Sequence, residues 1–272
     1  MRVGYQGEEG SYSHRAVTEV LELGDPVGYP TFAAAFDALE SMEIDRLVVP
    51  IENSTTGSVL PVLDRLPGDE EHQAFAIVRE HLVEVRHALI GLPGATLEGI
   101  REVRSHPEAL AQAEYHLTEL GVQEVPRRDT AGAVREVAEL ADPTVAALAP
   151  PWTADAHGLE VLASDTMDRD HNTTRFVVLA PGPPSVDEDD DKTTMVFTTA
   201  HTPGALALVL TELGLRGANL TRIESRPADE AWSYRFFVDL VHSPGPEGLA
   251  RVIEPLPANC DRLTVLGSYR AM

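Results

Sequence analysis

A proline-rich and acidic segment divides this chain into two unequal parts. Residues 180–192, APGPPSVDEDDDK, combine clustered prolines with a run of aspartate and glutamate. Such a segment cannot propagate a helix or a central strand, and it is polar enough to remain solvated. We therefore predict an interdomain linker over residues 181–192, one domain over residues 1–180 and a second over residues 193–272.

Before the linker, short apolar strands alternate with amphipathic helical stretches. This alternation predicts an α/β domain with a mostly parallel sheet. The predicted strands cover residues 2–7, 46–53, 87–92, 101–106, 144–150 and 175–180, and two of the predicted helices cover residues 13–23 and 31–42.

After the linker, the pattern changes to a compact set of six elements. Their order is β-α-β-β-α-β, which is typical of a ferredoxin-like split βαβ fold. The predicted strands cover residues 193–200, 219–227, 234–241 and 262–269, and the predicted helices cover residues 204–217 and 247–256.

The charge of the chain narrows the possible partners. The formal net charge of −23 argues against nucleic-acid binding, which needs a basic footprint. Lys192 is the single lysine. Such an acidic, lysine-poor chain is typical of a host with high internal salt, where charge repulsion is screened. This halophilic hypothesis fails if stability and activity do not change between roughly 0.1 and 2 M salt.

The single cysteine, Cys260, excludes an intrachain disulfide, a CxxC redox pair and a thiolate metal cluster. A small, partly buried apolar role is expected for it. No apolar run is long enough to span a bilayer, and the first ten residues lack the apolar core of a secretory signal. We therefore expect a cytoplasmic protein.

Polar clusters follow several of the predicted strands. Ser11 and Ser13 lie where a helix begins, so they could cap it and leave amide N–H groups free for an anion. Residues 52–55, ENST, leave the next strand in one turn. Each cluster alone is consistent with simple helix or turn capping. Together they indicate a ligand site at the rim of a sheet.

Two further clusters strengthen this interpretation. Ser105 and His106 stand at a strand-to-helix junction, with Pro107 in the first helical position, where its missing N–H costs little. Residues 171–175, HNTTR, precede the apolar end of the last predicted strand of the first domain. A strand of that kind is buried on both faces, so its polar end is expected at the same rim.

The ordered motifs GEEGSYS, PIENSTTGSV, SHPEALAQ, RDTAGAV and NTTRF, followed by GAL and ESRP, closely resemble the prephenate dehydratase family with its regulatory ACT domain. The resemblance covers essentially the whole chain. It implies a two-lobed catalytic domain like the type II periplasmic binding proteins, with the active site between the lobes. By this resemblance the first lobe holds roughly residues 1–76 and 160–180, and the second lobe holds the middle of the domain.

The resemblance also implies the reaction. Prephenate loses carbon dioxide and its ring hydroxyl to give phenylpyruvate, and aromatisation supplies the driving force, so no metal, flavin or nucleotide cofactor is expected. Family knowledge makes Thr174 the essential group acting on the departing hydroxyl. Arg175 is expected to bind a substrate carboxylate with its planar fork. A structural ion pair with a nearby aspartate is the alternative for Arg175.

The remaining site residues also follow from the resemblance. Glu52 is expected to orient its loop, and His106 is either a pocket residue or a packing residue. The sequence departs from the family pattern at Glu108, Ala113 and Ala207, where glutamine, cysteine and valine are common. The predicted substrate-binding residues are Asn53, Ser54, Thr55, Ser105, His106, Thr130 and Ala131.

The C-terminal motifs imply regulation by phenylalanine. The family binds this effector where two ACT modules meet, so a homodimer or homotetramer is expected. A chain ending near Pro184 is expected to retain turnover and lose the response to phenylalanine. The predicted effector-binding residues are Gly204, Ala205, Leu206, Asn219, Leu220, Glu224, Ser225, Arg226 and Pro227.

Two alternatives remain open from the sequence. An arogenate dehydratase would act on the amino-acid analogue of prephenate and yield phenylalanine directly. A non-catalytic amino-acid sensor would combine the two-lobed cleft with the ACT module. Loss of Thr174 or of the PIENS turn would have favoured the sensor, and both are present.

Overall fold

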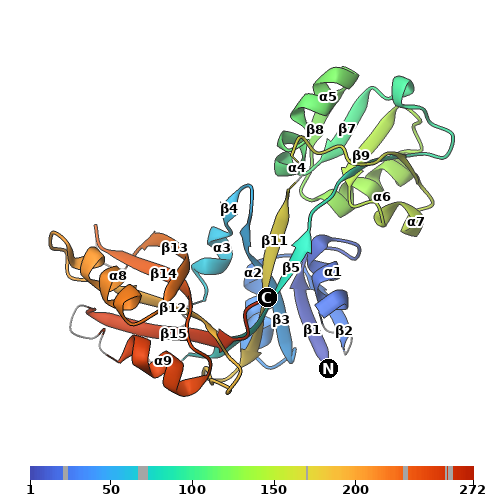
Figure 1. Cartoon of the computed structure of the whole chain (residues 1–272). Coiled ribbons are helices and arrows are strands. Elements are labelled where there is room, and N and C mark those ends of the chain that lie inside the picture. The colour runs from blue at the N-terminus through green and yellow to red at the C-terminus, as the bar shows by residue number, and fades with distance from the viewer. Residues whose placement is uncertain (21–23, 67–72, 170, 229–231, 255, 257–259) are drawn as a thin grey trace.

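The computed structural model describes the chain except residues 21–23, 67–72, 170, 229–231, 255 and 257–259. It has three parts (Figure 1): a central first lobe, a second lobe at upper right and a C-terminal domain at left. Within the described part of the chain, no helix has both the length and the apolar character needed to cross a membrane.

The first lobe is built on a mixed sheet with the strand order β2-β1-β3-β11-β5, and β4 pairs with β3. β1 runs parallel to β2 and β3, whereas β11 runs antiparallel to both of its neighbours. The prediction of a mostly parallel sheet is therefore wrong, because the returning strand β11 enters against its neighbours. The strands are β1 (Arg2–Gln6), β2 (Asp25–Tyr29), β3 (Arg46–Asn53), β4 (Gly57–Ser58), β5 (Phe75–Glu84) and β11 (Thr173–Pro181).

Helices α1 (Tyr12–Val20), α2 (Phe32–Glu40) and α3 (Leu60–Leu63) belong to this lobe. α2 illustrates why they form here. Thr31 caps its first turn by accepting a hydrogen bond from the Ala34 amide at 3.2 Å, and its alanine- and leucine-rich face is buried.

The second lobe has its own five-stranded sheet with the order β10-β6-β9-β7-β8. Its helices are α4 (Pro107–Ala111), α5 (Glu114–Leu120), α6 (Thr130–Leu140) and α7 (Thr153–Ala156), with a 3₁₀ turn η1 (Leu97–Gly99). Its strands are β6 (Ala88–Gly91), β7 (Glu102–Ser105), β8 (Gln123–Pro126), β9 (Val145–Ala149) and β10 (Glu160–Ala163).

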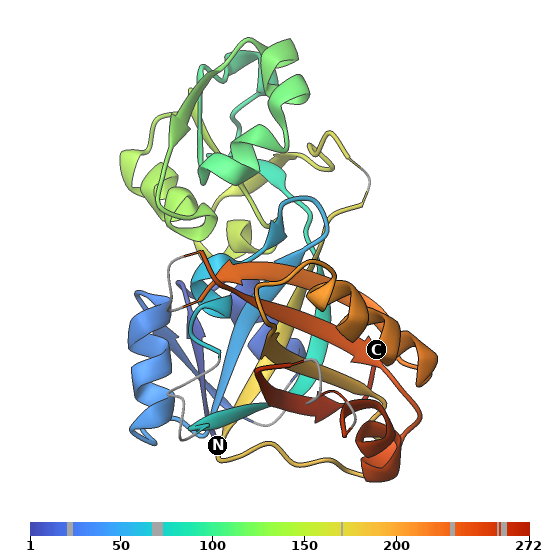
Figure 2. The same cartoon turned by 90° about the vertical axis from the view of Figure 1, so that its left-hand side faces the viewer.

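The chain crosses between the lobes twice, after β5 and before β11 (Figure 2). The predicted lobe boundaries are therefore wrong at both crossings. β5 keeps residues 75–84 in the first sheet, whereas β10 pairs with β6 in the second sheet. β5 escaped sequence detection because Arg79, Glu80 and His81 interrupt its apolar pattern.

The C-terminal domain confirms the predicted β-α-β-β-α-β order, with the antiparallel sheet β13-β14-β12-β15. The two-lobed α/β fold followed by a split βαβ domain is thus confirmed. The elements are β12 (Lys192–Thr198), α8 (Ala205–Leu215), β13 (Asn219–Pro227), β14 (Tyr234–Val241), α9 (Gly245–Ile253) and β15 (Arg262–Tyr269).

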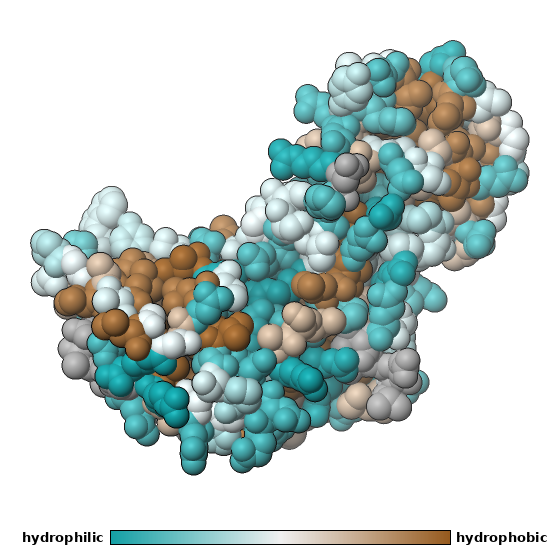
Figure 3. Space-filling model, viewed as in Figure 1, coloured by the Kyte–Doolittle hydropathy of each residue, from teal (hydrophilic) through white to brown (hydrophobic). Residues whose placement is uncertain are grey.

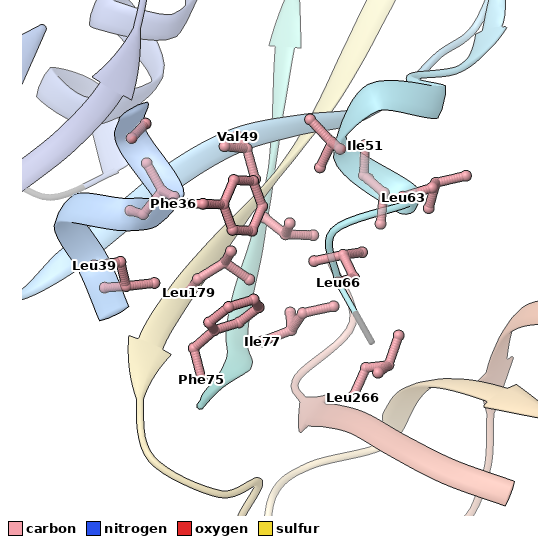
Figure 4. Close-up of a cluster of buried hydrophobic side chains, with 14 of the residues drawn as sticks. Phe36, Leu39, Val49, Ile51, Leu63, Leu66, Phe75, Ile77, Leu179 and Leu266 are labelled. Atoms are coloured by element: carbon pink, nitrogen blue, oxygen red, sulfur yellow. The ribbon is translucent and has the colours of Figure 1, made fainter. Parts of the chain in front are cut away.

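The first lobe and the C-terminal domain share one hydrophobic core. Figure 4 shows Leu266 of β15 beside Phe75, Ile77 and Leu66 of the first lobe. Gly267 allows this close approach, because a Cβ at this position would lie 2.0 Å from the backbone oxygen of Ile77. The acidic linker therefore joins two parts that are packed together.

Candidate active site

A cavity of about 750 Å³ lies between the two lobes. Both lobes contribute to its wall, together with the segment that returns to β11. Its size suits a small organic ligand. The side chains that carry the argument below line it: Ser11, Tyr12, Thr31, Asn53, Ser58, His87, His106, Arg128, Thr130, Asn172 and Thr174.

Asn53, at the end of β3, is the centre of a hydrogen-bond network on the cavity wall. Its Oδ1 accepts from the backbone amides of Thr55 at 2.9 Å and Thr56 at 3.1 Å. A backbone N–H can only donate, so these bonds fix which end of the amide is oxygen. The Nδ2 group must then donate, and it does so to Asn172 Oδ1 at 2.7 Å and Thr174 Oγ1 at 2.9 Å.

Gln112 closes this network from the second lobe. Asn172 Nδ2 donates to Gln112 Oε1 at 2.9 Å, and Gln112 Nε2 donates to Thr55 Oγ1 at 3.1 Å. The Thr55 hydroxyl donates to Asn53 Oδ1 at 2.6 Å, which closes the network. Asn53, Asn172, Gln112 and Thr55 thus form a closed ring, and Thr174 is attached to it through Asn53; we call the five residues the amide ring. Its donors and acceptors agree throughout, so it holds the two lobes in one defined arrangement.

The amide ring determines what the Thr174 hydroxyl can do. Its oxygen already accepts from Asn53, and no acceptor among the described residues takes its proton. The hydroxyl proton is therefore available to a ligand in the cavity. A donated hydrogen bond from Asn53 also stabilises negative charge that develops on this oxygen.

Charges of both signs line the cavity, since the carboxylates of Glu8, Glu108 and Asp129 share its wall with one guanidinium. Helices α1, α2 and α6 begin at its wall, near Ser11, Thr31 and Thr130, and helix N-termini carry partial positive charge. Among the described lining residues, Arg128 is the single lysine or arginine. Its Nη2 donates to the backbone oxygen of Pro30, which brings a second-lobe cation across to the first lobe.

Two aromatic side chains enclose the side of the cavity near α1. Burial lowers the pKa of His87 from its usual 6.5 to about 4, so its imidazole is neutral near pH 7. The Tyr12 hydroxyl donates to the backbone oxygen of Arg86 at 2.5 Å, and burial raises the pKa of Tyr12. The two rings meet edge to face, with centroids 5.5 Å apart.

The structure brings four of the predicted catalytic and substrate-binding residues to the cavity wall: Asn53, His106, Thr130 and Thr174. His106 also caps α4, accepting from the Glu108 amide at 3.2 Å. Their roles toward a substrate remain predictions.

Other predicted pocket residues support the wall from behind. Ser54 Oγ accepts from the Thr173 amide at 2.9 Å, and Thr55 belongs to the amide ring. Ser105 is fully buried and donates to the backbone oxygen of Leu148, while Ala131 is buried in α6. None of these four side chains lines the cavity. Burial explains this result for Ser105 and Ala131.

Arg175 lies outside the cavity, contrary to its predicted contact with substrate. Strand alternation directs its side chain away from Thr174. The guanidinium contacts Glu80 Oε2 at 3.2 Å and Glu52 Oε2 at 3.3 Å, and it also pairs with Asp239 of the C-terminal domain. This is the structural alternative that the sequence left open. Glu52 likewise faces the C-terminal domain.

The predicted effector residues fall into two groups within one chain. Gly204, Ala205 and Leu206 form part of a second cavity, of about 630 Å³, where α8 begins. Glu224 Oε2 accepts from Ser58 Oγ at 2.8 Å, and Arg226 makes two hydrogen bonds with Asp64, at 2.9 and 2.7 Å. Gly204, Ala205, Leu206, Glu224 and Arg226 form the first group, beside the end of β12. Asn219 and Leu220 form the second group, at the other end of the sheet. Ser225 and Pro227 complete the strand β13.

Sequence reasoning missed Gln112, Asn172, His87, Tyr12 and Arg128 as members of the site. The first two lie within the quoted motifs SHPEALAQ and HNTTRF, so their place beside other site residues was a usable signal. Tyr12 and Arg128 carry the same signal, since they lie within GEEGSYS and RDTAGAV, whereas His87 lies outside the quoted motifs and only the folded chain brings it to the cavity. Among the described residues, no group of three histidine, cysteine or acidic side chains is arranged to hold a metal ion.

Comparison with known proteins identifies the family. A family model for prephenate dehydratase matches residues 3–183, and one for the ACT domain matches residues 193–258. Arogenate dehydratase/prephenate dehydratase 2 of Arabidopsis thaliana is 37% identical over 99% of this chain and 72% of its own length. A bifunctional N-acyl-homoserine lactone acylase/prephenate dehydratase of Komagataeibacter europaeus is 33% identical over 99% of this chain and 95% of its own length.

A solved structure agrees with this result. Prephenate dehydratase from Arthrobacter aurescens, in complex with L-Phe, has a TM-score of 0.88 and 30% identity, covering 100% of this chain and 90% of that one. The chain therefore belongs to the prephenate dehydratase family and carries a C-terminal ACT domain.

Proposed function

We propose that this protein converts prephenate to phenylpyruvate in the cavity between its lobes. The bond to the ring carboxylate breaks, its electron pair enters the ring, and the ring C–O bond breaks with its electron pair leaving on oxygen. Carbon dioxide and hydroxide depart, and the ring becomes aromatic. The single observation that carries this proposal is the hydrogen bond from Asn53 to Thr174, which leaves the Thr174 proton available to the departing hydroxyl.

Thr174 acts here as a hydrogen-bond donor. A threonine hydroxyl is too weak an acid to be a populated proton source at pH 7. Donation into the C–O bond becomes stronger as negative charge grows on the leaving oxygen, so it favours the transition state over the bound substrate. Asn53 supports this donation by stabilising the charge that Thr174 acquires.

A dicarboxylate substrate is expected to bind at the positive groups of the cavity wall. These are Arg128 and the N-termini of α1 and α2, whereas Glu8, Glu108 and Asp129 add negative charge elsewhere on the wall. Arg128 takes the carboxylate-binding role that the sequence gave to Arg175. The neutral His87 adds no charge to this wall.

Arogenate is the second candidate substrate, and the name of the Arabidopsis relative supports it. Purified full-length protein should be assayed with prephenate and with arogenate, and the products phenylpyruvate and phenylalanine should be quantified separately. We expect a higher kcat/KM for prephenate. A higher value for arogenate would assign the second activity, and turnover of neither substrate would favour an amino-acid sensor.

Phenylalanine is the proposed effector, supported by its presence in the Arthrobacter structure. Within one chain, the register separates Gly204 from Asn219 by the length of the ACT sheet, so a pocket that contains both requires a second copy. Exposed Leu208, Leu215 and Ile223 offer apolar surface on α8 and β13. Figure 3 shows apolar surface over the ACT domain. We therefore propose a dimer or tetramer formed through this domain.

The hydrogen bond between Glu224 and Ser58 offers a direct route from the effector motif to the cavity, because Ser58 lines the cavity wall. Prephenate turnover should therefore fall as phenylalanine is added to the full-length protein, with a decrease in kcat. A change in KM alone, in a simple competitive pattern, would argue that phenylalanine binds in the cavity. Sedimentation analysis with and without phenylalanine tests the proposed oligomer.

A further inference from the structure

A group of six charged side chains, five of them buried and Glu52 partly exposed, lies between the first lobe and the ACT domain. It contains three cations and three anions, so its formal charges balance. Such groups are costly to bury unless each charge is paired. We call it the junction cluster: Glu52, Glu80, Arg175, Lys192, Arg222 and Asp239.

Arg175 connects the two sides of the junction cluster. Its side chain is 9% exposed and pairs with Glu80 and Glu52 of the first lobe and with Asp239 of the ACT domain. Asp239 is completely buried and also accepts from the Thr194 hydroxyl at 2.7 Å. Arg175 is thus fixed by groups that hold each other in place.

The position of Arg175 in the chain links the junction cluster to the active site. Arg175 follows Thr174 directly on β11, and their side chains point to opposite faces of the strand. The pairing with β3 shifts register between Arg175 and Phe176, so the ladder on this side of β11 is interrupted directly after Arg175, whereas the ladder with β5 is regular from Thr173 to Val178. At this irregular point, the ion pairs of Arg175 restrain the backbone that carries Thr174.

We propose that Arg175 is a positioning residue for Thr174, and that Asp239 of the ACT domain holds it in place. The ACT domain then supports the catalytic strand directly within the same chain. This inference rests on the proposed function for its kinetic test. It differs from a carboxylate-binding role, since Arg175 acts through the backbone of Thr174 and does not touch substrate.

The first test is Asp239→Asn in the full-length protein, assayed with prephenate. We expect kcat to fall about 10- to 100-fold, as for small misplacements of a catalytic group, with KM changed less than about 3-fold. Arg175→Lys should have the same signature, because a point charge cannot reproduce the fork. It also provides a second variant if Asp239→Asn fails to fold.

Asp64→Asn is the matched control. It removes the Arg226 ion pair between the same two domains, and neither residue lines the cavity or belongs to the junction cluster. This variant should retain kcat within about 2-fold, as expected for an exposed pair. A double variant with Asp239→Asn and Arg175→Lys should be no slower than the slower single variant, because both changes disrupt one linkage.

Amide hydrogen exchange of residues 171–179 provides a readout that needs no substrate. Faster exchange in Asp239→Asn and Arg175→Lys, and unchanged exchange in Asp64→Asn, would support positioning even if prephenate is not turned over. Unchanged exchange in both variants, an unchanged kcat in Asp239→Asn, or a rise in KM alone for Arg175→Lys would overturn the proposal. The last result would return Arg175 to substrate binding.

Discussion

The first lobe has two interfaces that differ in construction. Toward the second lobe it presents a cavity, bridged by the amide ring, by the Tyr12–Trp152 ring contact and by hydrogen bonds such as Trp152 Nε1 to the Gly10 oxygen at 2.8 Å. Toward the ACT domain it presents a continuous apolar core and the junction cluster. Separation of the first interface breaks polar and aromatic contacts around the cavity. The second loses buried apolar contacts if it separates.

Strand β11 serves both interfaces with adjacent residues. Thr174 faces the cavity and Arg175 faces the ACT domain. Successive side chains of a strand point to opposite faces, so Thr174 and Arg175 contact different neighbours. A change at one interface can therefore reach the other without a long path through the protein.

The largest effect is expected at the ACT interface. Leu266→Ala removes a fully buried side chain that packs between the domains, so the free energy of unfolding should fall by about 2–5 kcal/mol. Urea denaturation measures this change. A loss below about 1 kcal/mol would show that the shared core contributes little and that the two interfaces are alike.

A large effect is also expected at the cavity. Thr174→Val keeps the shape of the side chain and removes its hydroxyl, so kcat should fall about 10²- to 10³-fold while the fold is retained. Steady-state assays with prephenate measure this loss. Thr173→Val is the internal control, because the neighbouring side chain faces away from the cavity and its loss should cost far less. A near-normal kcat in Thr174→Val would remove this hydroxyl from the mechanism.

Acidic pH should lower the free energy of unfolding through His87, which lines the cavity between the lobes. Its pKa is about 4 in the folded protein and near 6.5 when unfolded, so the unfolded chain binds more protons between these values. Stability is unaffected by this group above pH 6.5 and falls by about 3 kcal/mol as the pH drops to 4. Unfolding measured across this window should show a shallower pH dependence in His87→Gln. His201→Gln, at an exposed site, should keep the slope of the wild type.

The smallest effect is expected at the rim of the ACT interface. The Arg226 guanidinium holds the pKa of Asp64 below its usual value, but the Asp64 side chain is 42% exposed. Asp64→Asn should therefore lower the free energy of unfolding by less than about 1 kcal/mol. A loss as large as that of Leu266→Ala would mean that ion pairs, rather than apolar packing, hold the ACT domain in place.

Much of the architecture could be predicted from local sequence patterns. The β-α-β-β-α-β order follows from apolar periodicity. The polar clusters after β1, β3 and β7 do line one cavity, but they meet there from two different sheets rather than at the rim of one. The partly exposed strand β5 could not be found this way, because Glu80 is polar in sequence and its buried charge is paired with Arg175 and Lys192 in the fold. Its charge had no visible partner in the linear sequence.

The linker sequence does not show whether the two domains that it joins are stable independently of each other. Its composition predicts separable domains, and a chain ending near Pro184 was expected to keep turnover. In the structure, such a chain would lose Leu266 and Tyr269 from the core it shares with the first lobe. Both residues look like the core of their own domain in sequence, so no local pattern reveals the second packing partner. We now expect the truncated chain to be destabilised.

The side of β11 occupied by Arg175 could have been predicted. Strand alternation puts Thr173 and Arg175 on one face and Thr174 on the other. A carboxylate-binding role for Arg175 is inconsistent with this alternation, which the structure follows. The amide ring, in contrast, depends on Gln112 from the second lobe. No sequence pattern shows that Gln112 lies within hydrogen-bond distance of Asn172 and Thr55.

The most direct test is the structure of the Thr174→Val variant with bound prephenate, since loss of the hydroxyl should slow turnover enough to trap the substrate. We predict that prephenate lies between the lobes, with its ring hydroxyl next to the side chain of residue 174 and a carboxylate near Arg128. Prephenate bound elsewhere, or with its ring hydroxyl turned away from residue 174, would contradict the proposed active site.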